Sequence, residues 1–240
     1  MPDFCEYPVD ELATQFWQQG YLALPDFFSP VQMQTIQHKI VEHFAGNPTF
    51  LHDAEFIEKS KAEVIPWFPQ RENQGQGFDE IESHSKLVEL TEAILGQGWN
   101  TQYCMVMLSN PGTKGQAWHQ DCPPEDSQLF NLNRLVYSMD VDDQTGGEVV
   151  IKPGSHKRGE LTKGELFEDF PDQVVLAPKA GTLVLIHGHC WHRVQPVKTK
   201  SRISTNFRAI PDGVPEQITD ICVYRNMRYQ FSTSKILVER

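Results

Sequence analysis

Residues 181–193 read GTLVLIHGHCWHR, in which a Gly-Thr pair and four apolar residues lead into three histidines. A short apolar run bounded by glycines is typical of a buried β-strand, because turn-forming residues interrupt the pattern on either side. The stretch therefore predicts a strand that ends beside several imidazole groups. Imidazole is the commonest metal ligand in proteins, so this end of the strand is a candidate site.

Short runs of strand character dominate the chain after Gly96. The expected strands cover residues 101–109, 132–141, 148–151, 173–176, 182–187 and 201–210. Pro-Gly, Gly-Gly and Lys-Ala-Gly sequences lie between them, as expected for turns. Many short strands separated by turn residues are typical of a β-sandwich or barrel. We therefore predict a catalytic double-sheet barrel over about residues 97–240.

The chain before Gly96 has helical periodicity instead. The expected elements are helices over about residues 10–20, 29–46 and 87–96, a strand over 21–24 and a surface loop over 70–77. Asp10 and Ser29 are the expected N-cap residues of the first two helices. No repeat or linker divides the chain, so we expect a single domain, 1–240, in which helices of the first 96 residues cover one sheet of the barrel.

The composition of the 240-residue chain excludes several classes of protein. Its formal net charge of −11 would repel a nucleic-acid backbone. No stretch reaches the roughly 18 apolar residues that a membrane helix needs. The five cysteines form no C-x-x-C pair, and the N-terminus is acidic where a secretory signal is basic. We expect a cytoplasmic protein with no nucleic-acid or membrane partner, and the oligomeric state stays open.

A second histidine motif, His119-x-Asp121, lies N-terminal to residues 181–193. Residues two apart in an extended segment point the same way, so this imidazole and carboxylate would converge. His192 is the third candidate ligand, with His187 and His189 as its competitors. Two histidines and one carboxylate on one side of an iron leave three positions open, enough for a bidentate 2-oxo acid and O2.

Arg202 follows His192 by ten residues. A hairpin that turns around residues 196–198 would place the two side chains opposite each other on adjacent strands. A guanidinium binds a carboxylate through two parallel hydrogen bonds and stays charged at any working pH. We therefore expect Arg202 to bind the far carboxylate of a 2-oxo acid.

Several motifs occur together in one order between residues 102 and 208. They read NPGT (110–113), QAWHQD (116–121), MDVDD (139–143), GGE (146–148), KPGSHK (152–157) and GT (181–182), followed by Trp191-His192 and Arg202. With these motifs in this order the chain resembles the phytanoyl-CoA dioxygenase (PhyH-like) family of Fe(II)/2-oxoglutarate-dependent oxygenases. The stretch from residue 20 to residue 29 also resembles the opening of that family.

The resemblance implies a fold that is mainly β with flanking helices, built on a double-stranded β-helix (jelly-roll) core. It implies iron held by His119, Asp121 and His192, with 2-oxoglutarate anchored by Arg202 and no further catalytic residue. The Trp-His pair and the distance to Arg202 select His192 over its two neighbours. Halogenases similar to this family lack the carboxylate, so Asp121 favours hydroxylation of a small molecule with Fe(II), 2-oxoglutarate and O2.

Alternation along the strand at 201–210 points Arg202, Ser204, Asn206 and Arg208 to the barrel interior. We expect Ser204 and Asn206 to contact the co-substrate or the substrate. Arg208 is a further pocket candidate, with a rim position that reaches solvent as its alternative. The other pocket candidates are Gln102, Trp118, Arg134, Tyr137 and Trp191. For Gln102, Arg134 and Tyr137 a purely structural role is the alternative, whereas we expect Trp118 and Trp191 on the pocket wall and not in catalysis.

Two other functions fit part of this pattern. A jelly-roll that binds a small ligand without turnover has no need for three open metal positions and a clamp for a 2-oxo acid. A hydrolase with zinc on the same three ligands leaves Arg202 without a purpose. A dioxygenase accounts for all four residues.

Overall fold

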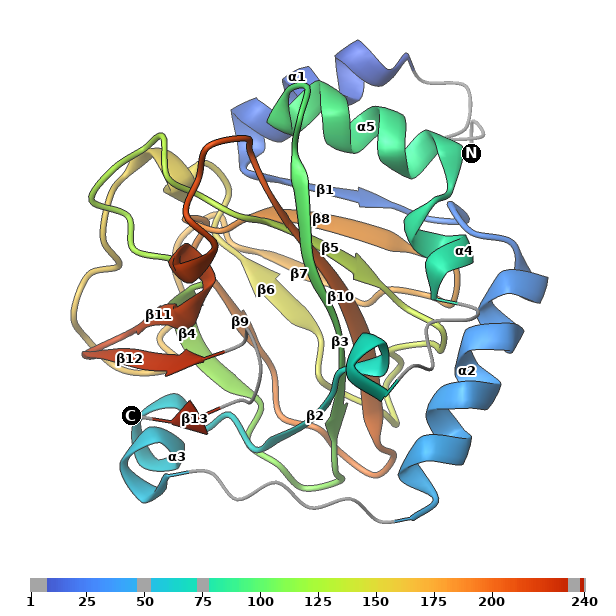
Figure 1. Cartoon of the computed structure of the whole chain (residues 1–240). Helices are drawn as coiled ribbons and strands as arrows, with labels where there is room; N and C mark the ends of the chain where they lie inside the picture. Colours follow the sequence, from blue (N-terminus) through green and yellow to red (C-terminus); the bar gives the residue numbers. More distant parts are fainter. Residues whose placement is uncertain (1–7, 47–52, 73–77, 233–237, 240) are drawn as a thin grey trace.

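The computed structural model describes residues 8–46, 53–72, 78–232 and 238–239 of the 240-residue chain. Two antiparallel sheets face each other and form a barrel (Figure 1). The strand order is β1-β8-β5-β10-β3-β2 in the six-stranded sheet and β13-β12-β11-β4-β9-β6-β7 in the seven-stranded sheet. This arrangement confirms the predicted jelly-roll with flanking helices.

The bounds of the elements are as follows. The six-stranded sheet contains β1 (Tyr21–Leu24), β2 (Val64–Trp67), β3 (Asn100–Ser109), β5 (Leu132–Val136), β8 (Leu183–His187) and β10 (Arg202–Ile210). The seven-stranded sheet contains β4 (Gln116–Gln120), β6 (Val149–Ile151), β7 (Val174–Leu176), β9 (His192–Val194), β11 (Ile221–Tyr224), β12 (Met227–Ser232) and β13 (Val238–Glu239). The helices are α1 (Val9–Gln19), α2 (Pro30–Phe44), α3 (Ala54–Ser60), α4 (Asp79–Glu82) and α5 (Ser85–Leu95).

Helices α1, α2 and α5 form where the sequence predicts them. The Ser29 hydroxyl accepts a hydrogen bond from the Gln32 N–H, and the Gln32 side chain accepts one from the Ser29 N–H. Gly20 ends α1 in the left-handed conformation, with φ of 80°. Asp10 lies in the first turn of α1 and not at its N-cap, which is Pro8. No helix among the described residues is long and apolar enough to cross a membrane.

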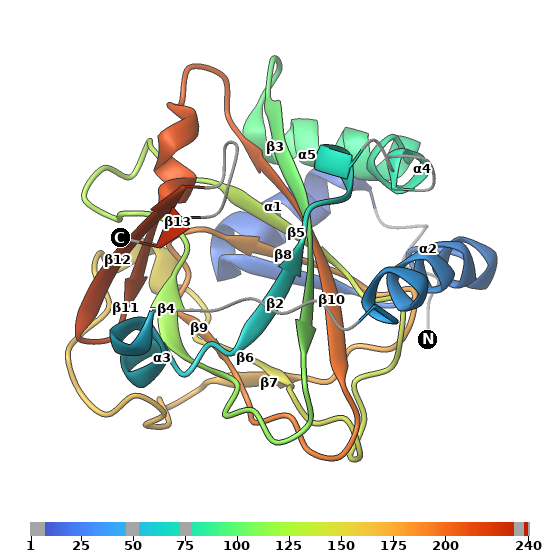
Figure 2. The same ribbon diagram turned by 60° about the horizontal axis from the view of Figure 1, so that its bottom comes forward.

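Helices α1, α2, α4 and α5 lie on the side of the six-stranded sheet, whereas α3 lies beside β4 of the other sheet (Figure 1). One apolar core joins Phe16 of α1 and Leu90 of α5 to Leu185 of β8 and Phe207 of β10. All nine residues of β10 are buried, and its polar side chains alternate with those of this core. The polar set lines the cavity between the two sheets, as the alternation predicts. Figure 2 shows β10 beside its ladder partner β3.

His192 and Arg202 do not face each other across a hairpin, so this prediction is wrong. Strand β9 pairs with β4 and β6, whereas β10 pairs with β3 and β5 in the other sheet. Between them, backbone groups of residues 195–200 hydrogen-bond to Thr113 and to residues 144–148. These partners carry the segment from one sheet to the other, so the two side chains approach across the barrel.

The sequence prediction lacks β2, α3 and the C-terminal hairpin of β11 and β12. The hairpin turns at Arg225 and Asn226, and Asn226 has a φ of 70°. Asparagine in this conformation is a signal of a two-residue turn. Arg225 is buried and donates to the carbonyls of Thr162 and Glu165, so the basic and aromatic stretch around it is a packing segment.

His187, at the end of β8, lies in a buried cluster of rings. It stacks on Phe130 at 4.3 Å between ring centroids, and its Nδ1 accepts a hydrogen bond from the His189 N–H. Burial lowers the pKa of His187 well below 6.5, and the neighbouring His189 and His156 lower it further. The folded protein therefore keeps His187 neutral, whereas the unfolded chain binds a proton there below pH 6.5.

We expect the free energy of unfolding to fall as pH drops below the unfolded pKa of His187, because the unfolded state binds more protons. The loss attributable to this residue is about 1.4 kcal/mol per pH unit. His187→Asn keeps an acceptor for the His189 N–H but does not titrate. Urea unfolding at about pH 7.5 and about pH 5.5 should show a smaller loss in the variant than in the unaltered protein. Equal losses would assign the acid sensitivity to other groups.

Candidate metal centre

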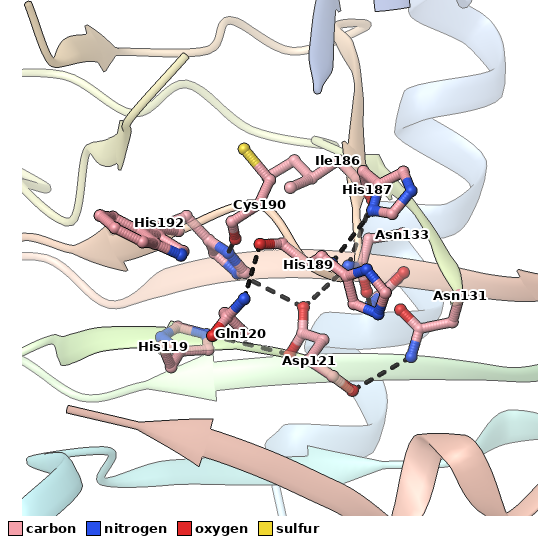
Figure 3. Close-up of polar contacts among 12 residues, drawn as sticks. His119, Gln120, Asp121, Asn131, Asn133, Ile186, His187, His189, Cys190 and His192 are labelled. Atoms are coloured by element: carbon pink, nitrogen blue, oxygen red, sulfur yellow. Dashed lines mark hydrogen bonds and ion pairs between the residues drawn. The ribbon is translucent and has the colours of Figure 1, made fainter. Parts of the chain in front are cut away.

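Three side chains from neighbouring strands meet at one point in the barrel interior (Figure 3). His119 on β4 and His192 on β9 are direct partners in the β4–β9 ladder. Asp121 follows β4 and shares a face with His119, because residues two apart in an extended segment point the same way. The Nε2 atom of His119 is 3.9 Å from Oδ1 of Asp121, and Nε2 of His192 is 3.4 Å from Oδ2.

Each imidazole has one nitrogen tied to the backbone and the other turned to this centre. Nδ1 of His119 lies 2.8 Å from the Ala117 carbonyl, and Nδ1 of His192 lies 2.9 Å from the Cys190 carbonyl. A carbonyl only accepts, so Nδ1 carries a proton in both rings and Nε2 is the nitrogen left to bind a metal ion. Burial, reinforced by His192, lowers the pKa of His119 to about 3, which keeps the ring neutral.

The Asp121 carboxylate is held at both oxygens. Arg208 Nη2 lies 3.2 Å from Oδ1, and Asn133 Nδ2 donates to Oδ2 at 2.7 Å. The Asn133 Oδ1 in turn accepts hydrogen bonds from Asn206 and Arg208. Burial raises the pKa of Asp121, but the Arg208 charge and the neighbouring His192 and His119 together outweigh burial and hold the pKa below its usual range. Asp121 is therefore ionised and oriented toward the two histidines.

Arg208 lines the cavity, as expected for a pocket residue, and the alternative of a rim position that reaches solvent is wrong. Its side chain is only 4% exposed and its guanidinium pairs with Asp121. A guanidinium this deep needs a compensating carboxylate, because an unpaired buried charge is strongly destabilising. Residue alternation alone does not show how deep in the barrel the end of β10 lies.

The donor set fits a divalent metal ion. The ligand atoms of His119, Asp121 and His192 all lie within 4.8 Å of one another, and the three residues are buried. Two imidazoles that turn Nε2 toward one point and one ionised carboxylate are the donors of facial iron sites. The cavity in front of them gives further ligands access from one side.

A second charged group lies further along the same side of β10. Arg202 donates from Nε to the Gly147 carbonyl at 2.7 Å, from Nη1 to the Ser204 hydroxyl at 3.1 Å and from Nη2 to the Tyr137 hydroxyl at 3.3 Å. It is buried, and no carboxylate among the described residues forms an ion pair with it. A buried guanidinium with only neutral partners is a ready site for an anion.

The Arg202 side chain passes over Gly147, where the absence of a Cβ atom leaves space for it. The φ of this glycine is 71°, and an added Cβ atom would lie 2.2 Å from Cδ of Arg202. Only glycine combines this backbone conformation with so close an approach. The Gly-Gly pair at 146–147 thus positions the guanidinium by leaving space for it.

The three metal-ligand candidates and Arg202 line one cavity of about 130 Å³. Ser204, Asn206 and Arg208 line it too, as part of the polar row on β10. Residues that the sequence does not single out complete the wall. These wall residues include Phe56, Tyr103, Asn133, Cys222, Tyr224 and Tyr229.

The two tryptophans that precede metal-ligand candidates do not line the cavity. Trp118 donates to the Glu168 carbonyl and Trp191 to the Gly159 carbonyl, and both rings pack against Phe170. Strand β4 contains an irregularity between residues 116 and 119, which alters the simple alternation of its side chains. Trp118 and Trp191 therefore belong to a packing cluster next to the site.

Arg134 and Tyr137 have structural partners. Arg134 is fully buried and pairs with Glu82 at 2.9 Å, on the face of β5 opposite to the cavity-lining Asn133. Tyr137 does not line the cavity, but its hydroxyl supports Arg202. Asn133, the residue before Arg134 on β5, is the one whose side chain reaches a metal-ligand candidate, Asp121.

Gln102 does not line the cavity either. It lies at an irregularity of the β3–β10 ladder, where the pairing passes from Tyr103–Arg208 to Thr101–Ala209. Tyr103, one residue further along, is the cavity residue at this end of β3. The irregularity could not be read from the sequence of β3 alone, because it depends on the pairing with β10.

Asn133 could have been found from the sequence as a polar residue between apolar ones in a predicted strand. We expect Asn133→Ala to weaken metal binding by about 10- to 100-fold, because Asp121 loses a partner that orients it. Competition with a chelator for Ni(II) measures the affinity. Asn100→Ala, an exposed change at the start of β3, is the control, and equal affinities in the two variants would contradict the role of Asn133.

A family model described as phytanoyl-CoA dioxygenase (PhyH) matches residues 16–204. A methylphosphonate hydroxylase of Gimesia maris is 22% identical over 223 residues, 85% of this chain and 82% of the relative.

Two solved structures share the fold. The epimerase SnoN in complex with Fe3+, alpha ketoglutarate and nogalamycin RO has a TM-score of 0.66 at 16% identity, over 90% of this chain and 86% of that one. HygX from Streptomyces hygroscopicus with nickel, 2-oxoglutarate and hygromycin B has a TM-score of 0.64 at 14% identity, over 86% and 88%. Iron and 2-oxoglutarate, the cofactors expected from the sequence, are thus bound by chains of this fold. On the match to the family model, which spans most of its length, the chain belongs to the phytanoyl-CoA dioxygenase (PhyH) family.

Proposed function

We propose that this chain is a single-domain Fe(II)/2-oxoglutarate-dependent dioxygenase that hydroxylates a C–H bond of a small molecule and releases succinate and CO2. The observation that supports this most directly is the content of one cavity. His119, Asp121 and His192 converge there, and Arg202 offers an unpaired charge on the same wall. These are the donors and the anion clamp that a metal and a 2-oxo acid need.

When bound, iron and 2-oxoglutarate supply the activation of O2 and the oxidation of the C–H bond. The residues of the chain bind, orient and shield. His119 and His192 present Nε2 atoms whose direction the backbone carbonyls set. Arg202 binds the far carboxylate of 2-oxoglutarate, with Ser204 beside it. The buried walls of the cavity exclude water from the reacting groups.

Two observations support hydroxylation as the outcome. Asp121 is present and ionised, so the third protein ligand is kept. The curated relative, which is 22% identical, is named as a hydroxylase of methylphosphonate. The fold itself does not select the reaction, since SnoN is an epimerase on a similar scaffold.

A cytoplasmic setting is part of this proposal. The described cysteines Cys104, Cys122, Cys190 and Cys222 are free and buried. Burial raises the pKa of Cys122 and of Cys190 to about 12, which keeps these thiols protonated. Free thiols are typical of reducing compartments.

The test is the consumption of 2-oxoglutarate. Protein loaded with Fe(II) under nitrogen is mixed with 2-oxoglutarate and a panel of small molecules, with and without O2, and succinate is quantified. We expect succinate only with both Fe(II) and O2. Binding without any turnover would support a ligand-binding protein, and hydrolysis that is independent of O2 would support a zinc enzyme. If 2-oxoglutarate neither binds nor turns over with iron present, the proposal is wrong.

A further inference from the structure

One end of the cavity is used neither by the metal-ligand candidates nor by Arg202. Tyr224 on β11 lies opposite His119 in the β11–β4 ladder, and the two rings stack at 4.9 Å. Phe56 of α3 contacts Tyr224 and Tyr229, with ring centroids 5.6 Å and 4.4 Å apart. Three aromatic rings thus form a wall next to a metal-ligand candidate. Such walls favour flat rings, which gain from stacked and edge-to-face contacts.

Tyr103 lines this cavity, and its buried hydroxyl has no hydrogen-bond partner among the described residues. The side chain is 4% exposed, and a buried hydroxyl without a partner costs free energy. Burial raises the pKa of Tyr103, so the hydroxyl keeps its proton and acts as a donor. An acceptor oxygen of a ligand would therefore satisfy this donor.

Arg208 stands beside this hydroxyl. It is the direct partner of Tyr103 in the β10–β3 ladder, and its guanidinium carbon lies 5.5 Å from the centroid of the Tyr103 ring. Its Nε and Nη2 atoms engage Asn133 and Asp121. An acceptor oxygen that reaches the Tyr103 hydroxyl would therefore lie close to a buried cation.

The charges of the cavity favour an acid over an amine. Asp121 is the only carboxylate among the described residues that line the cavity, and Arg208 and the two histidines surround it. Arg208 lies at this end of the cavity, whereas the charge of Arg202 on the same cavity is assigned to 2-oxoglutarate. A cationic substrate would find no available carboxylate, whereas an anionic group would be attracted.

We propose that this end of the cavity binds the substrate and that the substrate is a small aromatic carboxylic acid. Its ring packs against Phe56, Tyr224 and Tyr229, and its carboxylate accepts the hydrogen bond of the Tyr103 hydroxyl near Arg208. This assignment rests on the proposed function, because it places the substrate beside the proposed iron ligands. It adds a substrate class and a specificity residue, Tyr103, to that function.

The first experiment compares four probes that differ in one property each. Phenylacetate has the ring and the acid, cyclohexylacetate lacks the flat ring, benzylamine carries the opposite charge, and methylphosphonate is an anion without a ring. Calorimetric titration without O2 measures their binding to protein loaded with Ni(II) and 2-oxoglutarate. We expect phenylacetate to bind about 3- to 10-fold more tightly than cyclohexylacetate, and benzylamine to show no measurable binding. Tighter binding of benzylamine, cyclohexylacetate or methylphosphonate than of phenylacetate would overturn the proposal.

The second experiment isolates the hydroxyl. Tyr103→Phe should weaken phenylacetate binding by about 10-fold or more, because it removes a hydrogen bond to a charged group. The urea midpoint and the affinity for 2-oxoglutarate should not fall, since the hydroxyl has no hydrogen-bond partner among the described residues and Arg202 is untouched. Tyr21→Phe on β1, which does not line the cavity, is the matched control and should bind phenylacetate normally.

The outcomes separate the two proposals. Unchanged phenylacetate affinity in Tyr103→Phe overturns the role of the hydroxyl. Failure of all four probes to bind a protein that still binds 2-oxoglutarate overturns the substrate class and leaves the proposed function standing. Failure to bind 2-oxoglutarate at all overturns the proposed function and, with it, this inference.

Discussion

Asp121→Ala is expected to reduce O2-dependent succinate formation to the background of protein without iron. The change removes the only carboxylate from the three candidate ligands, and two imidazoles alone do not complete a facial site. The same change leaves Arg208 as a buried and unpaired cation. We therefore also expect the free energy of unfolding to fall by about 3 to 5 kcal/mol, as for other broken buried pairs.

A double variant separates the chemical loss from the structural one. Asp121→Ala combined with Arg208→Leu removes both charges, and replacing a buried pair by apolar groups is often neutral. Urea unfolding should show that the second change restores much of the stability, while succinate formation stays at background. Asp143→Ala, an exposed change, should behave as the unaltered protein in both assays. Activity retained in Asp121→Ala would mean that iron is held elsewhere.

The second large effect is expected for Arg202→Leu, in the binding of 2-oxoglutarate. Among the described residues that line the cavity, Arg202 is the arginine without an ion-pair partner, and its loss leaves the far carboxylate of the co-substrate without a partner. Loss of one partner of a buried charged contact typically costs about 2 to 5 kcal/mol, so we expect an affinity lower by about 30-fold or more. Titration of 2-oxoglutarate into Ni(II)-loaded protein measures it.

Two further variants test whether position matters as well as charge. Gly147→Ala keeps Arg202 but places a methyl group where the Cδ atom passes, at 2.2 Å. It should weaken 2-oxoglutarate binding without changing the net charge. Arg158→Leu removes a guanidinium from an exposed position and should leave the affinity unchanged. An Arg202→Leu protein that binds 2-oxoglutarate as tightly as the Arg158→Leu protein would contradict the clamp.

The parts of the site that are local in sequence could be predicted from it. His119 and Asp121 are two residues apart on one extended segment, so their convergence follows from strand geometry alone. The polar row on β10 follows from the same alternation. Family resemblance, carried by the order of the motifs, predicted His192 and Arg202 as the other site residues. The hairpin predicted between these two residues does not form.

The rest depends on which strands become neighbours. Tyr224 reaches His119 only through the β11–β4 ladder, more than 100 residues away along the chain. Tyr103 and Arg208 meet only through the β3–β10 ladder, next to an irregularity that turns Gln102 away from the cavity. Registers of this kind are set by the packing of the whole barrel and not by the local pattern. Trp118 is a similar case, because an irregularity in β4 precedes His119.

The segment between β9 and β10 has a consequence for recognising relatives of this chain. His192 is held by the ladders of one sheet and Arg202 by those of the other, so each keeps its place without the other. The ten-residue spacing between them is therefore a property of the connecting loop and not of the site. Loops tolerate insertions at small entropic cost. A search that demanded this spacing would miss chains with a longer connection and the same ligands, whereas matching the two strands separately would find them.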